Sequence, residues 1–366
     1  MGQFSPSAPK QLDARQSYVA GLDGLRAIAI STVFLGHAFS NVIANSVGVD
    51  MFFALSGFLI TRGLVAQLES SGRIELRTFY IRRALRLFPA LVVVVGTLLV
   101  VAVALKVLIQ RPLMPEIKAS VTALTYVMNW SHAFRLWPPG WLGHTWSLSI
   151  EEQFYLLWPL ILIATYKWGG IKGSLRCAGL LALLSVFLRL YLYHSGATGD
   201  RIYNGFDTRA DELLIGCALA LAKPFSLSRW AARLWFVPVL AIAWVFFFVP
   251  WFALYTLSST IIAAASAWLI LPLWAQSIPW MATALEFRPI RYIGRISYGL
   301  YLWHWPTLAI LRELHFARNG LKTIALTGTI TLLCAAASFH FVERPILRLK
   351  TRVRRGVSST AAAVAG

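Results

Sequence analysis

Charged residues are scarce in this chain of 366 residues, since Asp, Glu, Lys and Arg together make up 13% of it. Soluble proteins carry about 25% charged residues, so this chain could not cover its own surface with polar groups. Hydrophobic residues instead make up 58%. The balance excludes a soluble globular domain, a disordered chain and a collagen-like one. It predicts an all-α polytopic membrane protein.

Cysteine is also rare. Cys177, Cys217 and Cys334 each lie in an apolar stretch, far apart and without CxxC spacing. This pattern favours neither a disulfide framework nor a metal site. We interpret the three as small core residues.

Acidic residues are outnumbered by basic ones, 15 to 34, which leaves a net charge of +19. Nucleic acid could attract such a charge, but here the basic residues lie between apolar runs rather than in one polar domain. Anionic lipid and the excess of Lys and Arg on the cytoplasmic side of membrane proteins account for this pattern better. The sequence thus predicts contact with membrane lipid and no nucleic-acid partner.

The apolar residues form ten runs, and crossing a bilayer takes about 20 such residues. A further stretch at 119–131 is shorter and more polar, so we expect it to be interfacial or re-entrant. The ten predicted transmembrane helices are near 24–43, 48–66, 87–109, 149–167, 177–194, 207–223, 234–252, 254–275, 296–312 and 323–342.

Charge indicates the orientation of these helices. With ten spans and a cytoplasmic N-terminus, most Lys and Arg residues fall in loops on the cytoplasmic side. We therefore expect a cytoplasmic tail at 1–20 without a signal peptide, one transmembrane domain at 21–346, and a cytoplasmic tail at 347–366 that is first basic and then rich in Ser and Ala. The basic residues from Arg344 to Arg355 suit contact with lipid headgroups.

Ionisable side chains inside a span are costly, so each one is a functional candidate. In the first run, Arg26 and His37 are eleven positions apart, which places them on one helix face about 16 Å apart along the axis. A histidine there can handle protons or act as a general base. The alternatives are an Arg26 that reaches the inner interface and a buried neutral His37.

Three arginines, Arg82, Arg83 and Arg86, precede the third run. Arg83 and Arg86 share a helix face at i and i+3, as do Arg82 and Arg86 at i and i+4. Guanidiniums this close repel one another unless an anion lies between them, and Arg suits bidentate phosphate binding. The cluster indicates either a cytoplasmic ligand with phosphate groups or an ordinary positive cluster on the cytoplasmic side.

The segment 146–155 leads into the fourth run. Ser149 and Glu152 have the spacing of a capping box, which predicts the start of a helix there. Glu151 has no such structural reason, so it is a candidate for chemistry on the outer side, where His37 also points. The free N–H groups of a helix start would suit a carboxylate or an oxyanion.

Polar residues mark two more runs. Asp50 lies in the second, where Gly57 indicates close helix packing. Polar stripes of this kind either join helices or line a cavity. The ninth run carries such a stripe at i, i+4 and i+7, formed by Ser297, Tyr301 and His304.

Taken in this order, these elements resemble the membrane acyltransferase-3 family of bacterial O-acyltransferases. The resemblance covers nearly the whole chain, from Leu22 to Pro345. Some family members carry a second, esterase-like domain after the last span, and we expect this chain to lack it. The matching segments are 22–37, 48–60, 82–89, 146–155, 297–306 and 341–345.

The resemblance implies an O-acetyltransferase of the bacterial cytoplasmic membrane. Such an enzyme moves an acyl group, usually acetyl from acetyl-coenzyme A (acetyl-CoA), to a hydroxyl of an extracytoplasmic or lipid-linked carbohydrate. Acyl-CoA would be the donor substrate, and no tightly bound cofactor or metal is implied.

The resemblance also implies roles for individual residues. His37 would be the base for the acceptor hydroxyl or a transient acyl carrier, and Glu151 would orient the acceptor or His37 from the outer side. The phosphates of coenzyme A would be held by arginines, namely Arg26, Arg83 and Arg86 with Arg82 beside them. The other candidates would line the site: Trp146, Ser147, Tyr155, Ser297, Tyr301, His304 and Asp50.

Two other classes of function stay open at this point. A proton-coupled transporter or flippase of a glycan or small anion would use Arg26, His37 and Glu151 as a proton relay. Its activity would depend on proton-motive force and not on an acyl thioester. A non-catalytic receptor would leave Arg83, Arg86 and His37 without a common purpose.

Overall fold

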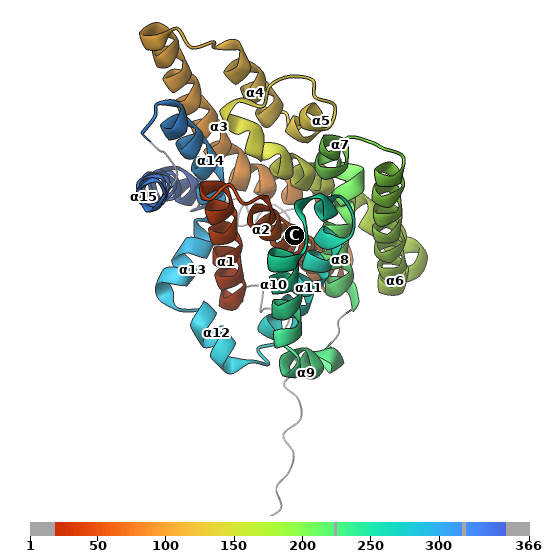
Figure 1. Cartoon of the computed structure of the whole chain (residues 1–366). Helices are drawn as coiled ribbons and strands as arrows, with labels where there is room; N and C mark the ends of the chain where they lie inside the picture. Colours follow the sequence, from red (N-terminus) through yellow and green to blue (C-terminus); the bar gives the residue numbers. More distant parts are fainter. Residues whose placement is uncertain (1–18, 223–224, 317–319, 349–366) are drawn as a thin grey trace, which may run out of the picture.

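The computed structural model describes residues 19–222, 225–316 and 320–348, and every regular element within these ranges is helical (Figure 1). The prediction of an all-α chain is confirmed. The helices are α1 (Ala20–Ala38), α2 (Val42–Ser71), α3 (Leu76–Ile109), α4 (Met114–Leu124), α5 (Met128–Ala133), η1 (Gly140–Thr145), α6 (Trp146–His194), α7 (Gly199–Asn204), α8 (Phe206–Ala222), α9 (Phe225–Arg233), α10 (Phe236–Phe248), η2 (Trp251–Tyr255), α11 (Ser258–Trp274), α12 (Pro279–Leu285), α13 (Arg288–Arg295), α14 (Ser297–Glu313), α15 (Leu321–Ser338) and the π-helix η3 (Phe339–Glu343).

The predicted apolar runs coincide largely with these helices. The runs 149–167 and 177–194 are the two arms of α6, which bends at Gly170 with φ 58° and ψ −152°, a conformation that Gly adopts easily. Among the described residues, four helical segments are long and apolar enough to cross a membrane, or five if the bent pair α11–α12 is one span. Others are too short by this measure, such as α8 with 17 residues. Ten spans with both ends in the cytoplasm therefore remain a prediction.

The stretch 119–131 is not one continuous helix. It holds the end of α4 and most of α5, separated by a turn in which Tyr126 has a φ of 54°. Most of the predicted N-terminal tail and the predicted tail 347–366 beyond residue 348 lie outside the described residues.

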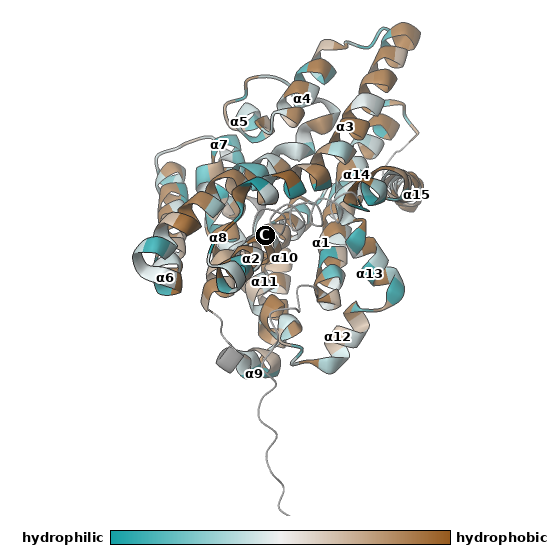
Figure 2. Cartoon of the chain, turned by 180° about the vertical axis from the view of Figure 1, so that it is seen from behind, coloured by the Kyte–Doolittle hydropathy of each residue, from teal (hydrophilic) through white to brown (hydrophobic). Residues whose placement is uncertain are grey.

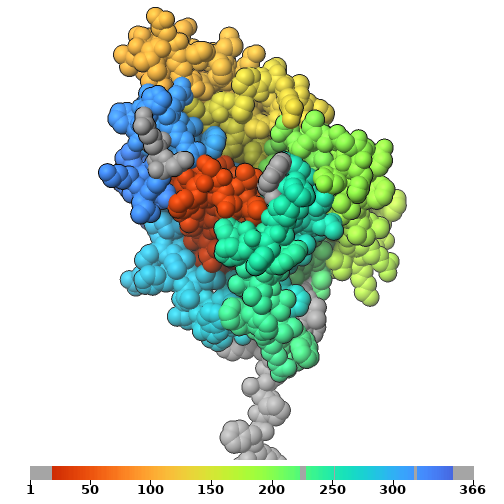
Figure 3. Space-filling model, in the orientation of Figure 1, coloured from red at the N-terminus to blue at the C-terminus, as the bar shows by residue number. Residues whose placement is uncertain are grey.

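Helix α1 lies among the other elements rather than at the edge of the bundle. It packs against α2, α13 and α14, and α8 packs against both α2 and α6. Figure 3 shows α1 in the middle of one face, between the C-terminal helices and α10–α11. Large apolar side chains are exposed on α3 and α6, among them Val100, Val107, Leu180 and Phe187. Hydrophilic residues gather on α13 (Figure 2). The outward sides of α3 and α6 are therefore suited to contact with lipid.

Glycines allow α2 and α8 to approach closely. A Cβ on Gly57 would overlap the carbonyl oxygen of Leu213, and a Cβ on Gly216 would overlap that of Ala54. The prediction that Gly57 serves close packing is confirmed.

We expect Gly57→Ala to destabilise the protein by at least about 2 kcal/mol, because the methyl group would push two backbones apart. Thermal unfolding in detergent measures the change. Gly63→Ala on the same helix is the matched control, since a Cβ there meets nothing within 4 Å. This variant should be neutral or stabilised by up to about 1 kcal/mol, because Ala favours a helix more than Gly does. Equal melting of the two variants would refute the packing role.

Candidate active site

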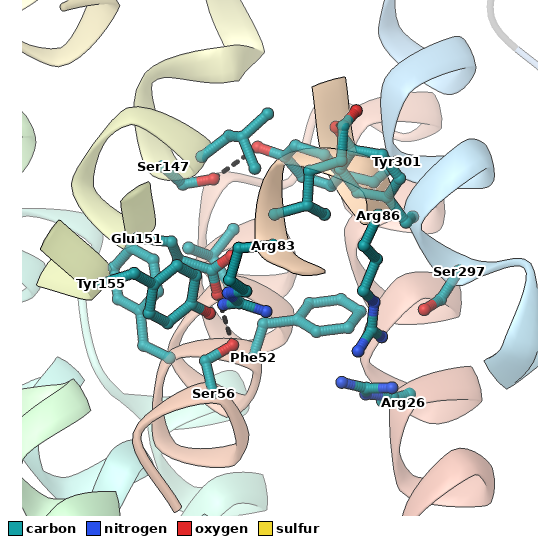
Figure 4. A pocket seen from close by; sticks show the side chains of 15 residues that line it. Arg26, Phe52, Ser56, Arg83, Arg86, Ser147, Glu151, Tyr155, Ser297 and Tyr301 are labelled. Atoms are coloured by element: carbon teal, nitrogen blue, oxygen red, sulfur yellow. Dashed lines mark hydrogen bonds between the residues drawn. The ribbon is translucent and has the colours of Figure 1, made fainter. Parts of the chain in front are cut away.

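Three arginines line one cavity of about 660 Å³ in the middle of the bundle. Arg26 comes from α1, and Arg83 and Arg86 come from α3. The guanidinium groups of Arg26 and Arg86 face each other, and that of Arg83 points toward Glu151 and Tyr155 (Figure 4). The remaining lining residues come from α2, α3, α6 and α14: Val49, Phe52, Phe53, Ser56, Leu87, Ser147, Leu148, Glu151, Tyr155, Ser297, Tyr298 and Tyr301. We call this space the arginine cavity.

Arg83 has unused hydrogen-bond donors. Its Cζ lies 3.4 Å from the centroid of the Tyr155 ring, a cation–π contact that fixes the guanidinium plane. Its Nε and one Nη are buried and have no hydrogen-bond partner among the described residues. Buried donors normally have partners because leaving one unpaired is costly. A buried guanidinium with two unpaired nitrogens is thus suited to bind an anion.

Glu151 lies on the opposite wall of the same cavity. The hydroxyl of Ser56 donates to its Oε1 at 2.6 Å, which joins α2 to α6. Helix α1 contributes a second acid near these arginines. Oδ1 of Asp23 lies 3.9 Å from Nη1 of Arg26. Glu151 and the three arginines therefore line one cavity.

The predicted capping box is wrong. Helix α6 begins at Trp146, so Ser149 already lies inside it and donates to the carbonyl of Thr145 at 3.0 Å. A hydroxyl bonded four residues back belongs to a helix interior and not to a cap. Because the short helix η1 leads directly into α6, this helix begins at Trp146 instead of near 149. Glu152 is thereby freed from the structural role given to it by the sequence pattern.

Three histidines gather beside the arginine cavity. The ring centroid of His304 lies 5.2 Å from that of His37 and 5.3 Å from that of His144. His37 also contacts Trp305, at 4.6 Å between ring centroids. Neither ring nitrogen of His144 has a hydrogen-bond partner among the described residues. We call His37, His144 and His304 the histidine cluster.

Tyr301 joins the histidine cluster to the arginine cavity. Its hydroxyl donates to the carbonyl oxygen of His144, so Ser147 is the donor in the 2.6 Å bond between Ser147 Oγ and the Tyr301 oxygen. The Tyr301 ring lies 5.4 Å from His304. His37 itself is not among the residues that line the arginine cavity. Tyr301, which lines the cavity, contacts His304, and His304 contacts His37.

A comparison with protein-family models matches residues 19–339 to the acyltransferase-3 family, described as an acyltransferase domain. The chain belongs to this acyltransferase family. The match includes every helix that contributes to the arginine cavity and the histidine cluster.

Curated relatives of this acyltransferase include proteins of Listeria monocytogenes and Staphylococcus aureus. The chain is 34% identical to peptidoglycan O-acetyltransferase OatA of Listeria monocytogenes over 352 residues, which are 90% of this chain and 56% of that protein. It is 30% identical to O-acetyltransferase OatA of Staphylococcus aureus over 355 residues, 90% of this chain and 57% of that protein. The chain therefore spans little more than half the length of these relatives. No solved structure matches it.

The structure brings most of the predicted site residues of the acyltransferase together. Arg26, Arg83, Arg86 and Glu151 line the arginine cavity, and His304 lies in the histidine cluster. Arg82 does not line the cavity, although it shares a helix with Arg83. Four of the other predicted lining residues also line the arginine cavity, namely Ser147, Tyr155, Ser297 and Tyr301.

Asp50 does not line the cavity. Its Oδ1 accepts from Nη2 of Arg209 at 2.6 Å, and both side chains are fully buried. Trp146 packs beside this pair, with its ring 4.9 Å from that of Tyr203. The two residues support the wall of the site instead of facing it.

Asp50 belongs to a buried charge cluster that the sequence analysis missed. It consists of Asp50, Arg189, Arg209, Asp211 and Glu212, all with fully buried side chains. Arg189 donates to both carboxylate oxygens of Asp211, at 2.9 and 3.0 Å. The signal was present in the sequence, because Arg209, Asp211 and Glu212 all lie in the predicted span 207–223.

We expect Asp50→Asn to destabilise the protein by at least about 2 kcal/mol, since it removes one of the two carboxylates that face the buried guanidinium of Arg209. Thermal unfolding at fixed detergent concentration tests this. The control is Asp200→Asn, which breaks the solvent-exposed pair of Asp200 with Arg135. That pair should contribute no more than about 1 kcal/mol. A melting temperature equal to that of the wild type for Asp50→Asn would show that the ion pair does not hold α2 and α8 together.

Proposed function

We propose that this chain transfers an acetyl group from acetyl-CoA to a hydroxyl of a carbohydrate acceptor in the bacterial cytoplasmic membrane. The observation that carries the proposal is the arginine cavity, where Arg83 offers two buried, unpaired nitrogens beside Arg26 and Arg86. Coenzyme A carries phosphates, and planar guanidiniums recognise phosphate oxygens in pairs. These three arginines would hold the donor.

The donor would enter from the end of the bundle where α1 begins. A second space shares Arg26, Arg83 and Arg86 with the arginine cavity and extends to Val19 and Leu22 at the start of α1. Orientation by charge predicts this end to face the cytoplasm, where acetyl-CoA is made. The arginines shared by the two spaces therefore support a cytoplasmic donor.

The histidine cluster would supply the proton chemistry. His37 would remove the proton from the acceptor hydroxyl, whose oxygen then attacks the thioester carbonyl carbon. The carbon–sulfur bond breaks, and coenzyme A leaves as a thiol after it receives a proton from the imidazolium. Alternatively, His37 itself carries the acetyl group between donor and acceptor. Tyr301 lies between the two parts of the site and would position the reacting groups.

The names of the relatives support acetyl as the group and carbohydrate as the acceptor. The Listeria relative is named a peptidoglycan O-acetyltransferase. Because the chain spans little more than half of that protein, we carry over only the general reaction and propose a cell-envelope glycan as the acceptor.

The test is saturable binding and slow hydrolysis of acetyl-CoA by purified protein in nanodiscs. Free coenzyme A should compete with acetyl-CoA, because it retains the phosphates that the arginines would bind. S-acetylpantetheine, which lacks the nucleotide, should not compete. The absence of any affinity for acyl thioesters would overturn the proposal and favour a proton-coupled transporter, which flux assays with an imposed proton gradient would reveal.

A further inference from the structure

A second cavity of about 1,310 Å³ lies between α3 and α6, and the turn between α4 and α5 closes one side of it. We call it the α3–α6 groove. Two hydrogen bonds hold its walls in place. The hydroxyl of Tyr80 donates to the carbonyl of Leu156 at 2.9 Å, and Nε2 of Gln153 donates to the carbonyl of Tyr126 at 2.7 Å. The proposed function makes no use of this groove.

The rim of the groove is apolar and exposed. The exposed fraction is 44% for Phe88, 41% for Val127 and 58% for Leu156. Both α3 and α6 belong to segments apolar enough to cross a membrane. If both helices span the bilayer, this exposed apolar rim faces its hydrocarbon, and a ligand could enter sideways from the membrane.

The inner end of the groove is charged. It is lined by Arg83 and Glu152, and Oε1 of Glu152 is buried without a hydrogen-bond partner among the described residues. An unpaired polar atom at this depth is costly, which indicates a polar ligand group beside it. A carboxylate accepts from hydroxyls and a guanidinium donates to oxygens, so the pair matches a hydroxylated head group.

The inner end of the groove also borders the proposed donor site. Arg83, Leu87 and Tyr155 line both the groove and the arginine cavity. The stacked pair of Arg83 and Tyr155 therefore forms part of the wall between them. A head group in the groove is separated from the arginine cavity by one layer of side chains.

We propose that the α3–α6 groove binds the acceptor as a carbohydrate attached to a lipid tail. The tail lies along Phe88, Val127 and Leu156, and the hydroxylated head group binds Glu152 and Arg83. The acceptor then borders the arginine cavity at the wall that Arg83 and Tyr155 form. Its role as acceptor rests on the proposed function, whereas the binding of a lipid-tailed carbohydrate can be tested separately.

The test is photolabelling of the full chain in nanodiscs with a dodecyl glucoside that carries a diazirine in its alkyl chain. Labelled peptides should concentrate in 80–88 and 152–157. Excess unlabelled dodecyl glucoside should prevent the labelling, and an equal excess of dodecylphosphocholine should not. Ala84→Trp, which fills the groove from α3, should reduce labelling by about tenfold. Val127→Trp should act in the same way if the first variant folds poorly.

The matched control is Val100→Trp, which places the same side chain on α3 at a position that is 70% exposed and outside the groove. It should label like the wild type. Labelling spread along 91–109, or equal protection by dodecylphosphocholine, would overturn the proposal. Protection by a long-chain acyl-CoA but not by the glucoside would assign the groove to the donor. Acetyl-CoA hydrolysis, measured on the same samples, reports the proposed function independently of the labelling pattern.

Discussion

The double variant Arg83→Ala/Arg86→Ala should lose affinity for acetyl-CoA by about 1,000-fold, or about 4 kcal/mol. Each charge-assisted hydrogen bond is worth about 1.5–3 kcal/mol, and the two guanidiniums would each contribute at least one. Equilibrium binding of radiolabelled acetyl-CoA in nanodiscs measures the loss. Hydrolysis should fall at low acetyl-CoA concentration and recover in part when the concentration is raised.

Arg77→Ala is the control for this double variant. Arg77 lies on the same helix and is exposed, outside the arginine cavity. Its removal changes the net charge and leaves the cavity intact, so affinity should stay within about threefold of the wild type, or about 0.7 kcal/mol. If the double variant binds as the wild type does, the arginines serve orientation in the membrane and not the donor.

His37→Ala should separate binding from turnover. Because His37 lies outside the arginine cavity, the variant should bind acetyl-CoA within about threefold of the wild type. Its turnover should fall between about 100- and 10,000-fold, the range that general acid–base groups contribute. Single-turnover hydrolysis at saturating acetyl-CoA measures the chemical step directly.

His194→Ala controls for the loss of a histidine as such, because His194 is exposed at the end of α6. It should retain full turnover. His37→Gln keeps the volume and one donor, so its melting temperature shows whether a loss of activity arises from misfolding. Turnover by His37→Ala within about tenfold of the wild type would remove His37 from the mechanism and direct attention to His144 or His304.

Local spacing explains why much of the site could be predicted. Arg83 and Arg86 are three positions apart on one helix, so a shared cavity followed from helix geometry alone. The spacing of eleven positions predicted that Arg26 and His37 share a helix face. The two residues nevertheless do not line the same cavity, since only Arg26 lines the arginine cavity. His37 instead packs against His304 of α14, which is 304 − 37 = 267 positions away, and such a distant partner leaves no trace in a local pattern.

Other features depended on contacts that a single sequence does not contain. Asp50 resembled a cavity residue because its partner, Arg209, is 159 positions away. The capping box at Ser149 was wrong because η1 runs into α6 without a break. The α3–α6 groove exists because the turn between α4 and α5 closes one side of it. These two helices are short, so the sequence did not predict where they pack. Long-range packing decided each of these features.

The most direct test of the account is a structure of the full chain in nanodiscs with a non-hydrolysable acetyl-CoA analogue. The account predicts that phosphates of the analogue lie among Arg26, Arg83 and Arg86, and that the acetyl end points toward Tyr301 and the histidine cluster. An analogue bound elsewhere on the chain, with the arginine cavity still free of phosphate, would contradict it.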